Sequence, residues 1–85
     1  MAGYSVFFRK SVEKDLSRMP DRDLHRIIER IGLLADDPRP PGCKKLSARE
    51  RYRIRQGKYR ILYSIRDEEC TMWVIKVRHR KEVYR

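Results

Sequence analysis

With 85 residues and a hydrophobic content of 40%, the chain is long enough for one small domain with a modest core and too short for two. No run approaches the roughly 20 apolar residues of a membrane span, and no apolar stretch typical of a secretion signal opens the sequence, so we expect a cytoplasmic protein with no membrane partner. Cys43 and Cys70 lack CxxC spacing and are too few for a zinc site or a disulfide framework, so we expect no metal or other cofactor.

The net charge of +10 arises entirely in the second part of the chain. Residues 1–38 hold seven Lys or Arg against seven Asp or Glu, whereas residues 39–85 hold fifteen against five. A balanced part followed by a basic part is typical of proteins that bind a polyanion. A solvated surface accounts for basic residues equally well, so the positions of these charges matter more than their sum.

A short strand and two helices are predicted before the Pro-rich joint. Residues 4–8 form a β-rich run. Ser11 is the predicted N-cap of a first helix that ends before Pro20, because the apolar residues between them fall on one helical stripe. Asp21 is the predicted cap of a second helix, whose apolar residues recur at three- and four-residue steps up to Asp36. So short a connection predicts an antiparallel helical hairpin.

Three strands are predicted after the joint, over residues 51–56, 59–66 and 71–77. Gly57 lies in the first turn, and three acidic residues form the second. Consecutive strands with tight turns form an antiparallel meander. The order β-α-α-β-β-β therefore predicts a two-layer α+β domain over residues 1–85, in which the N-terminal strand is followed by an antiparallel helical hairpin that packs on an antiparallel β-sheet.

Alternation along the predicted strands gathers basic side chains on one face of the sheet. Arg51, Arg53 and Arg55 point to one side, and Tyr52 and Ile54 point to the other. In the second strand, one face carries Arg60, Leu62, Ser64 and Arg66. The other face carries Tyr59, Ile61, Tyr63 and Ile65. In the third strand, one face carries Trp73, Ile75 and Val77, and the opposite face carries Met72, Val74 and Lys76. One face packs on the helices while the other presents the strand arginines.

Motifs in the second part of the chain resemble the RelE branch of the RelE/ParE toxin superfamily. In order they are Lys45-Leu46, Tyr52-Arg53-Ile54-Arg55, Gly57, Tyr59-Arg60-Ile61-Leu62-Tyr63 and the segment from Val77 to Arg85. The resemblance covers essentially the whole chain and is densest from Lys45 onward. It implies a single RelE-like toxin domain over residues 1–85, with a microbial-RNase-like fold, that acts in a type II toxin–antitoxin pair.

The resemblance also implies an activity and a set of partners. The expected activity is ribosome-dependent, metal-independent cleavage of mRNA in the A site through attack by a ribose 2′-hydroxyl, which inhibits translation. The expected partners are a cognate acidic, RelB-like antitoxin, the ribosome with its mRNA, and operator DNA reached only through the antitoxin complex. Two alternatives share the fold: a ParE-like inhibitor of DNA gyrase, and an inactive member that only binds its antitoxin and operator.

The resemblance assigns charge stabilisation of the scissile phosphate to Arg53, Arg55 and Arg60. Arg suits this task because its planar guanidinium donates two hydrogen bonds to phosphate and stays charged. A further catalytic arginine corresponds to either Arg78 or Arg80, and the sequence leaves this choice open. The chain departs from the best-known RelE pattern by carrying Arg where Lys often stands on the first strand of the hairpin.

Tyr84 matches the C-terminal catalytic tyrosine of the family, and neighbouring arginines would favour its phenolate, which makes it a candidate general base. His79 is a candidate proton donor, and Glu50 is a further candidate for proton transfer. The chain stops one residue after Tyr84, with no C-terminal helix after it, and the sequence leaves open whether the segment after Val77 is helical or extended.

The sequence also indicates which residues attract RNA and which aromatic residues lie in the core. Residues expected to attract RNA without acting on the reacting phosphate are Lys44, Lys45, Arg49, Arg51 and Lys58. Aromatic residues expected in the core, and not as platforms for bases, are Tyr59, Tyr63 and Trp73, while Tyr52 is left open.

Overall fold

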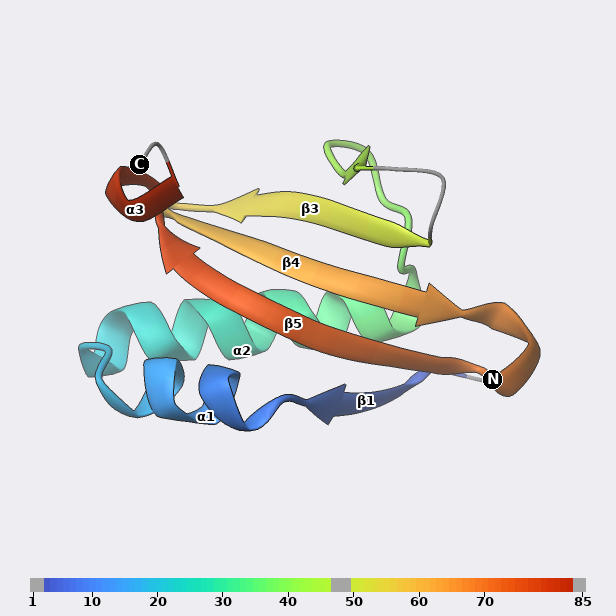
Figure 1. Ribbon diagram of the computed structural model, residues 1–85, viewed down its shortest axis with the longest axis horizontal. Helices are drawn as coiled ribbons and strands as arrows, with labels where there is room; N and C mark the ends of the chain where they lie inside the picture. Colours follow the sequence, from blue (N-terminus) through green and yellow to red (C-terminus); the bar gives the residue numbers. More distant parts are fainter. Residues whose placement is uncertain (1–2, 47–49, 84–85) are drawn as a thin grey trace.

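The computed structural model describes residues 3–46 and 50–83 of the chain. A five-stranded sheet, in the order β1-β5-β4-β3-β2, carries the longest helix, α2, on one face, and α1 lies beside β5 beyond the end of β1 (Figure 1). The elements are β1 (Ser5–Phe8), α1 (Lys10–Ser17), α2 (Asp21–Asp36), β2 (Lys44–Lys45), β3 (Arg51–Gln56), β4 (Tyr59–Arg66), the 3-10 helix η1 (Asp67–Glu69), β5 (Thr71–His79) and α3 (Arg80–Val83). In this described part of the chain, no helix is long and apolar enough to cross a membrane.

The predicted two-layer α+β architecture is confirmed, with two differences in the sheet. The sheet is mixed and not purely antiparallel, because β1 lies along the edge of the sheet and pairs with β5 in the parallel direction, Ser5 opposite Thr71. A two-residue strand, β2, pairs with β3 at the other edge. β1 and β5 are far apart in the sequence, and β2 is only two residues long. Local patterns of hydrophobicity do not reveal pairings of either kind.

The two long helices end where expected but begin differently. α1 begins at Lys10 with Arg9 as its N-cap, so Ser11 lies inside the first turn and its predicted capping role is wrong. α2 has Pro20 as its N-cap, and Asp21 is its first residue. A carboxylate in the first turn still interacts favourably with the helix dipole, so Asp21 stabilises this end without capping it.

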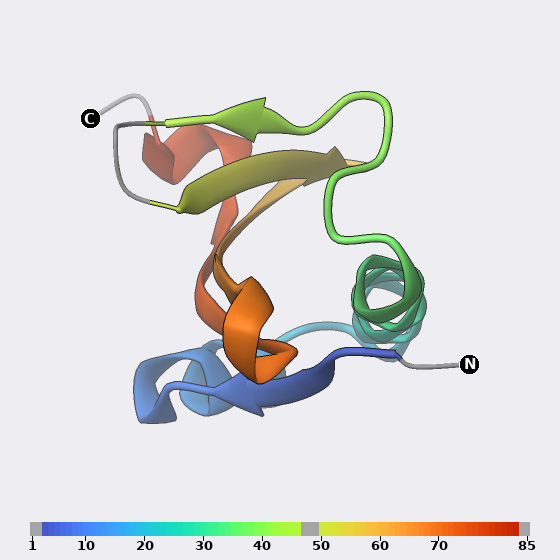
Figure 2. The same ribbon diagram turned by 90° about the vertical axis from the view of Figure 1, so that its right-hand side faces the viewer.

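The core lies between α2 and the concave face of the sheet, which curves around this helix (Figure 2). Amphipathic spacing along α2 turns Ile27, Ile31 and Leu34 inward. The strands contribute Tyr52, Ile54, Ile61, Tyr63, Ile65, Met72, Val74 and Val77. Tyr63 is fully buried, and its hydroxyl donates to the Pro38 carbonyl at 2.6 Å, which fastens the Pro-rich joint to the centre of the sheet.

A β-bulge interrupts the alternation of β5. Leu62 lies opposite Lys76 and Tyr63 lies opposite Val74, so Ile75 is an extra residue on β5. Strict alternation placed Val77 on the face of Trp73, away from Val74. That prediction is wrong, because Val77 belongs to the core together with Val74.

Arg39 ties together four segments at the end of the sheet away from α3. Its guanidinium contacts the Glu50 carboxylate at 2.6 Å and the Asp67 carboxylate at 2.9 Å. Its Nε donates to the Tyr52 hydroxyl at 2.9 Å, and the Tyr4 hydroxyl donates to Asp67 at 2.6 Å. These contacts connect the Pro-rich joint to the start of β3, to η1 and to the residue before β1.

This network predicts a loss of stability in acid. Hydrogen bonds from Lys45 and Arg39 lower the pKa of Glu50 from 4.5 to about 2, and those from Arg39 and Tyr4 lower the pKa of Asp67. Because the folded pKa lies below the unfolded one, this stabilisation is fully present above pH 4.5 and is lost as the pH falls toward about 2. In thermal unfolding followed by circular dichroism, we expect Arg39→Gln to flatten the fall in Tm across this window.

The matched control is Glu29→Gln, which removes an exposed carboxylate of α2 outside the network. This variant should keep the pH dependence of the unsubstituted protein. An Arg39→Gln variant that loses stability in acid as steeply as the control would contradict the role of the network.

Candidate functional site

Three arginines form one row across the outer face of the sheet, the face away from the long helices. Arg55 of β3 lies opposite Arg60 of β4, and Arg60 lies opposite Arg78 of β5. Side chains directly opposite one another on adjacent strands have Cβ atoms about 5 Å apart. This arginine row therefore concentrates positive charge at the end of the sheet where the β3–β4 hairpin turns.

The hairpin turn accounts for the alignment of the first two arginines. Gly57 and Lys58 connect β3 to β4, and Gly57 has a φ of +61°, in the left-handed region that glycine adopts without strain. Tight two-residue turns of this kind match the twist of the strands that they join. The tight turn therefore fixes the register that places Arg55 directly opposite Arg60.

Arg60 is the one buried charged residue in the described part of the chain, with 4% of its surface exposed. It lines a hollow of about 290 Å³ together with Arg55, Tyr59 and Arg80. The backbone N–H of Arg80 donates to the Lys58 carbonyl at 2.7 Å, which fastens the start of α3 to the hairpin turn. The sequence leaves open whether the segment after Val77 is helical or extended, and the structure forms the short helix α3 there, beside the end of the sheet where the β3–β4 hairpin turns (Figure 1).

Both candidates for the further arginine thus lie at the same end of the sheet. Arg78 belongs to the row on β5, and Arg80 lines the hollow from the first turn of α3. The bulge at Ile75 is what brings Arg78 to this face. Without it, alternation from Met72 would turn Arg78 toward the helices.

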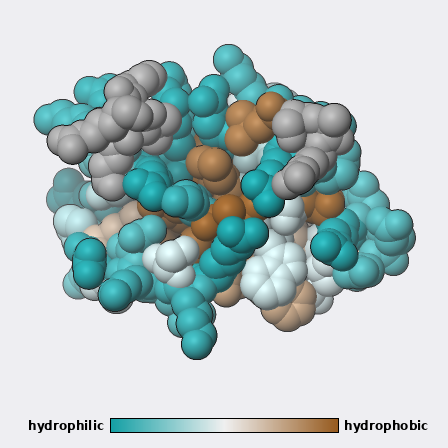
Figure 3. Space-filling view, viewed as in Figure 1, coloured by the Kyte–Doolittle hydropathy of each residue, from teal (hydrophilic) through white to brown (hydrophobic). Residues whose placement is uncertain are grey.

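A second group of cations borders the row. Arg53 lies on the same outer face two residues before Arg55, opposite Leu62 on one side and Lys44 of β2 on the other. Lys76 lies beyond Leu62 and was missed as a surface cation, because strict alternation assigned it to the face of Met72. Hydrophilic side chains cover most of this face around a central apolar strip (Figure 3).

His79 lies on the other face of the sheet. It is opposite Tyr59, and the two rings meet edge to face with their centroids 5.4 Å apart. The Tyr59 hydroxyl donates to Asp23 of α2 at 3.0 Å, which marks this as the face that carries the helices. The His79 Nδ1 accepts from the backbone N–H of Lys81 at 3.2 Å. His79 therefore lies on the opposite face of the sheet from the arginine row.

Other predicted residues lie apart from the row. Lys45 is opposite Tyr52 and forms an ion pair with Glu50 at 2.9 Å, so both side chains lie apart from the arginine row. The low pKa of Glu50 keeps it ionised and makes it a poor donor of protons. Arg51 lies on the outer face opposite Ser64, and Lys58 is exposed in the hairpin turn.

Tyr84 and Arg49 lie outside the described residues. Within the described ranges, no group of three or more His, Cys, Asp or Glu side chains is arranged to hold a metal ion.

Comparison with known proteins decides the family. The family model of the ParE toxin of the type II toxin–antitoxin system parDE matches residues 6–84. The chain belongs to the RelE/ParE toxin superfamily. It is 36% identical to toxin RelG of Mycobacterium tuberculosis, over 96% of this chain and 97% of RelG.

Solved structures place this toxin in the RelE-like branch. A chain of the M. tuberculosis RelBE2 toxin–antitoxin complex is 33% identical, with a TM-score of 0.80 over 93% of each chain. A chain of the archaeal RelE–RelB complex from Pyrococcus horikoshii OT3 is 26% identical, with a TM-score of 0.81 over 92% of this chain and 96% of that one. The protein is therefore a type II toxin of the RelE family.

The arginine row predicts a salt-dependent cost in stability. Like charges on directly opposite strand positions repel one another, and added salt screens that repulsion. We expect Arg55→Gln to stabilise the RelE-like toxin by about 0.5 kcal/mol at low salt and by less at high salt. Urea unfolding at two salt concentrations measures this difference. Arg26→Gln, on the exposed surface of α2, is the control, and an equal salt response of both variants would contradict repulsion within the row.

Proposed function

We propose that this RelE-like toxin is a metal-independent endoribonuclease that cleaves mRNA in the ribosomal A site. The arginine row is the observation that carries the proposal. When a ribose 2′-oxygen attacks the adjacent phosphorus, negative charge on the phosphate oxygens increases. Guanidinium groups already held in position stabilise that charge more strongly in the transition state than in the ground state.

The row and its surroundings suit this task in two respects. Arg60 is held between neighbouring strands and little exposed, so its charge is screened less by water than that of a surface arginine. Arg80 approaches the same hollow from α3, which allows cations from two directions to contact one phosphate. Arginine is a poor general base because it stays protonated, so these residues stabilise charge and do not move protons.

The proposed reaction forms a bond between the 2′-oxygen and phosphorus and breaks the bond between phosphorus and the 5′-oxygen. A base removes the 2′-hydroxyl proton, and the leaving 5′-oxygen gains a proton. The products are a 2′,3′-cyclic phosphate and a free 5′-hydroxyl. We assign the base to Tyr84 on its match to the family's C-terminal tyrosine, with Arg53, Arg55, Arg60 and Arg78 or Arg80 as charge stabilisers.

We propose an acidic, RelB-like antitoxin as the cognate partner, with operator DNA contacted only through that complex. Two relatives were solved as complexes of RelE-type toxins with their antitoxins. A net charge of +10 favours both an acidic protein and ribosomal RNA as partners. An antitoxin that covers the arginine row would prevent mRNA from binding there. The expected site of action is the cytoplasm, where the ribosomes are.

A second candidate is inhibition of DNA gyrase, because the family model that matches the chain is that of the ParE toxin. That activity has no need of a tyrosine amid arginines at the C-terminus, such as Tyr84. A supercoiling assay with purified gyrase separates the two functions. Loss of supercoiling together with intact message would favour this candidate.

Cleavage can be tested in a translating extract programmed with a defined message, with cuts mapped by primer extension. We expect cuts within the A-site codon. Arg80→Ala, Tyr84→Phe and Arg60→Lys should each lower the cleavage rate on the order of 100-fold or more, because each removes an interaction made in the transition state. Arg60→Lys keeps the charge and loses the planar fork, which limits damage to the fold.

Circular dichroism establishes that these variants remain folded, and Arg26→Ala on α2 serves as the control for loss of positive charge. Intact message in the presence of actively translating ribosomes would reject the proposed function. Full activity of folded Arg60→Lys and Tyr84→Phe would reject the roles of these two residues, and full activity of folded Arg80→Ala would assign the further arginine role to Arg78.

A separate prediction concerns His79, which the structure places on the helix side of the sheet. His79→Asn should retain cleavage within a few-fold, because Asn Oδ1 can accept the backbone hydrogen bond from Lys81 that His79 Nδ1 accepts. The dependence of the cleavage rate on pH between 5 and 8 should also be unchanged. A loss of activity comparable with that of Tyr84→Phe in a folded His79→Asn protein would contradict this placement.

A further inference from the structure

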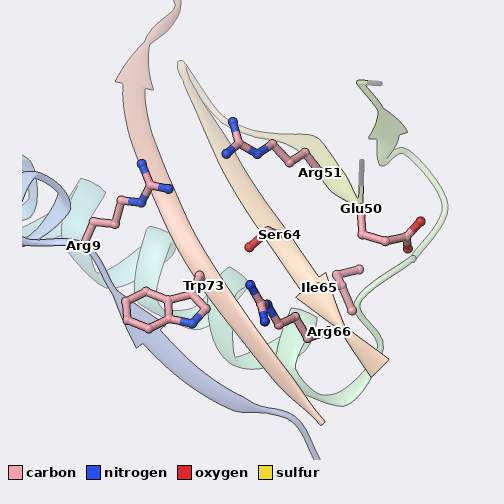
Figure 4. A pocket seen from close by; sticks show the side chains of 7 residues that line it. All are labelled: Arg9, Glu50, Arg51, Ser64, Ile65, Arg66 and Trp73. Atoms are coloured by element: carbon pink, nitrogen blue, oxygen red, sulfur yellow. The ribbon is translucent and has the colours of Figure 1, made fainter. Parts of the chain in front are cut away.

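A second hollow lies on the outer face toward the opposite end of the sheet from the arginine row. Its volume is about 560 Å³, within the range of ligand-binding pockets. The lining residues are Arg9, Glu50, Arg51, Ser64, Ile65, Arg66 and Trp73 (Figure 4). Of these, only Arg51 was predicted to contact RNA, and the proposed cleavage uses none of them.

The hollow is strongly cationic. The guanidinium groups of Arg9, Arg51 and Arg66 are disposed around Ser64 (Figure 4). Within the described residues, no acidic side chain forms an ion pair with Arg9 or Arg51, and the pair between Arg66 and Glu69 is long, at 3.7 Å, and exposed. An exposed pair of this kind contributes little energy, so Arg66 is available to a ligand.

Glu50 does not offset these charges. Its carboxylate points away from the three guanidinium groups and is occupied by Arg39 at 2.6 Å and Lys45 at 2.9 Å (Figure 4). The interior of the hollow therefore attracts an anion.

Trp73 adds an aromatic surface to this cationic hollow. It was predicted in the core, but 38% of its surface is exposed. Its indole stacks on Phe7, the opposite residue of β1, with ring centroids 5.1 Å apart and planes inclined by 26°. Phe7 is itself 43% exposed, so the two rings form an apolar platform that the fold leaves in water.

An exposed indole beside three arginines matches the chemistry of single-stranded nucleic acid. Bases stack on aromatic rings, and guanidinium groups bind the phosphates that flank them. An acidic peptide would use the arginines but would gain little from the indole. We propose that this hollow binds one nucleotide of a single-stranded RNA, with its base on Trp73 and its phosphate between Arg51 and Arg66.

The inference rests on the proposed function in that RNA is the substrate. Ser64 in the hollow and Arg60 in the row are four residues apart on β4, about 13 Å along the strand. One RNA strand can span that distance across the outer face. A nucleotide held at Trp73 would then fix the position of the message relative to the arginine row.

The chain offers a direct reporter, since Trp73 is its single tryptophan. The probe is a short single-stranded RNA with 2′-O-methyl groups, which attack by a 2′-hydroxyl cannot cleave, and no ribosome is added. We expect this RNA to quench the emission of Trp73 in a saturable manner, with the same Kd as the anisotropy of a labelled copy. A polyglutamate peptide of equal charge should quench far less.

Substitutions assign the contacts. Trp73→Leu should weaken RNA binding about five- to 100-fold, the effect of losing one base–aromatic stack, whereas Trp73→Phe should retain most of it. Arg51→Gln and Arg66→Gln should each reduce the slope of log Kd against log salt by about one. Arg26→Gln on α2, with the same change of charge, should leave the quenching intact.

Two results would overturn the inference: RNA binding by anisotropy with unchanged Trp73 emission, or polyglutamate quenching that equals that of RNA. The first needs no variant, so it does not depend on the folding of Trp73→Leu. Because the RNA cannot be cut, absence of cleavage on the ribosome with intact quenching would reject the proposed function alone. Cleavage without quenching would reject this inference alone.

Discussion

The β-bulge at Ile75 is the constraint on which the outer face of the sheet depends. One extra residue in β5 reverses the direction of every side chain that follows it, which sends Val77 into the core and Arg78 to the surface. A strand without the bulge would turn Arg78 toward the helices, and burying a guanidinium without a compensating partner costs several kcal/mol. The same irregularity thus completes the core and the row Arg55-Arg60-Arg78.

Charge is separated along the sheet in a way that serves both stability and binding. At one end, Arg39 gathers the carboxylates of Glu50 and Asp67 and fastens four segments together. At the other end, three arginines lie side by side, an arrangement that opposes folding through repulsion. Sites that bind a ligand commonly carry such a cost, because the charges that destabilise the free protein are the ones that the ligand neutralises.

The outer face joins two kinds of recognition on one rigid surface. The arginine row offers charge to a phosphate, and the hollow at Trp73 offers an aromatic platform next to further cations. Because both rest on β4 and β5, their separation is set by the rise of the strand and not by a flexible loop. A RelE-like toxin built in this way can hold one nucleotide of a single RNA strand at Trp73 while it acts on another nucleotide of that strand at the arginine row.

Local patterns in the sequence determined β3 and β4, the end of α2, and the shared face of Arg53, Arg55 and Arg60, because period-two alternation and turn residues act over a few positions. They could not reveal the parallel pairing of β1 with β5, which depends on how distant segments pack. The bulge, the inward direction of His79, the exposure of Trp73 and the helical turn that begins at Arg80 were likewise decided by tertiary structure. Sequence alone identified the arginines as candidates, and only the packing of β5 against β1 and β4 brought Arg78 into line with them and left the indole open to a ligand.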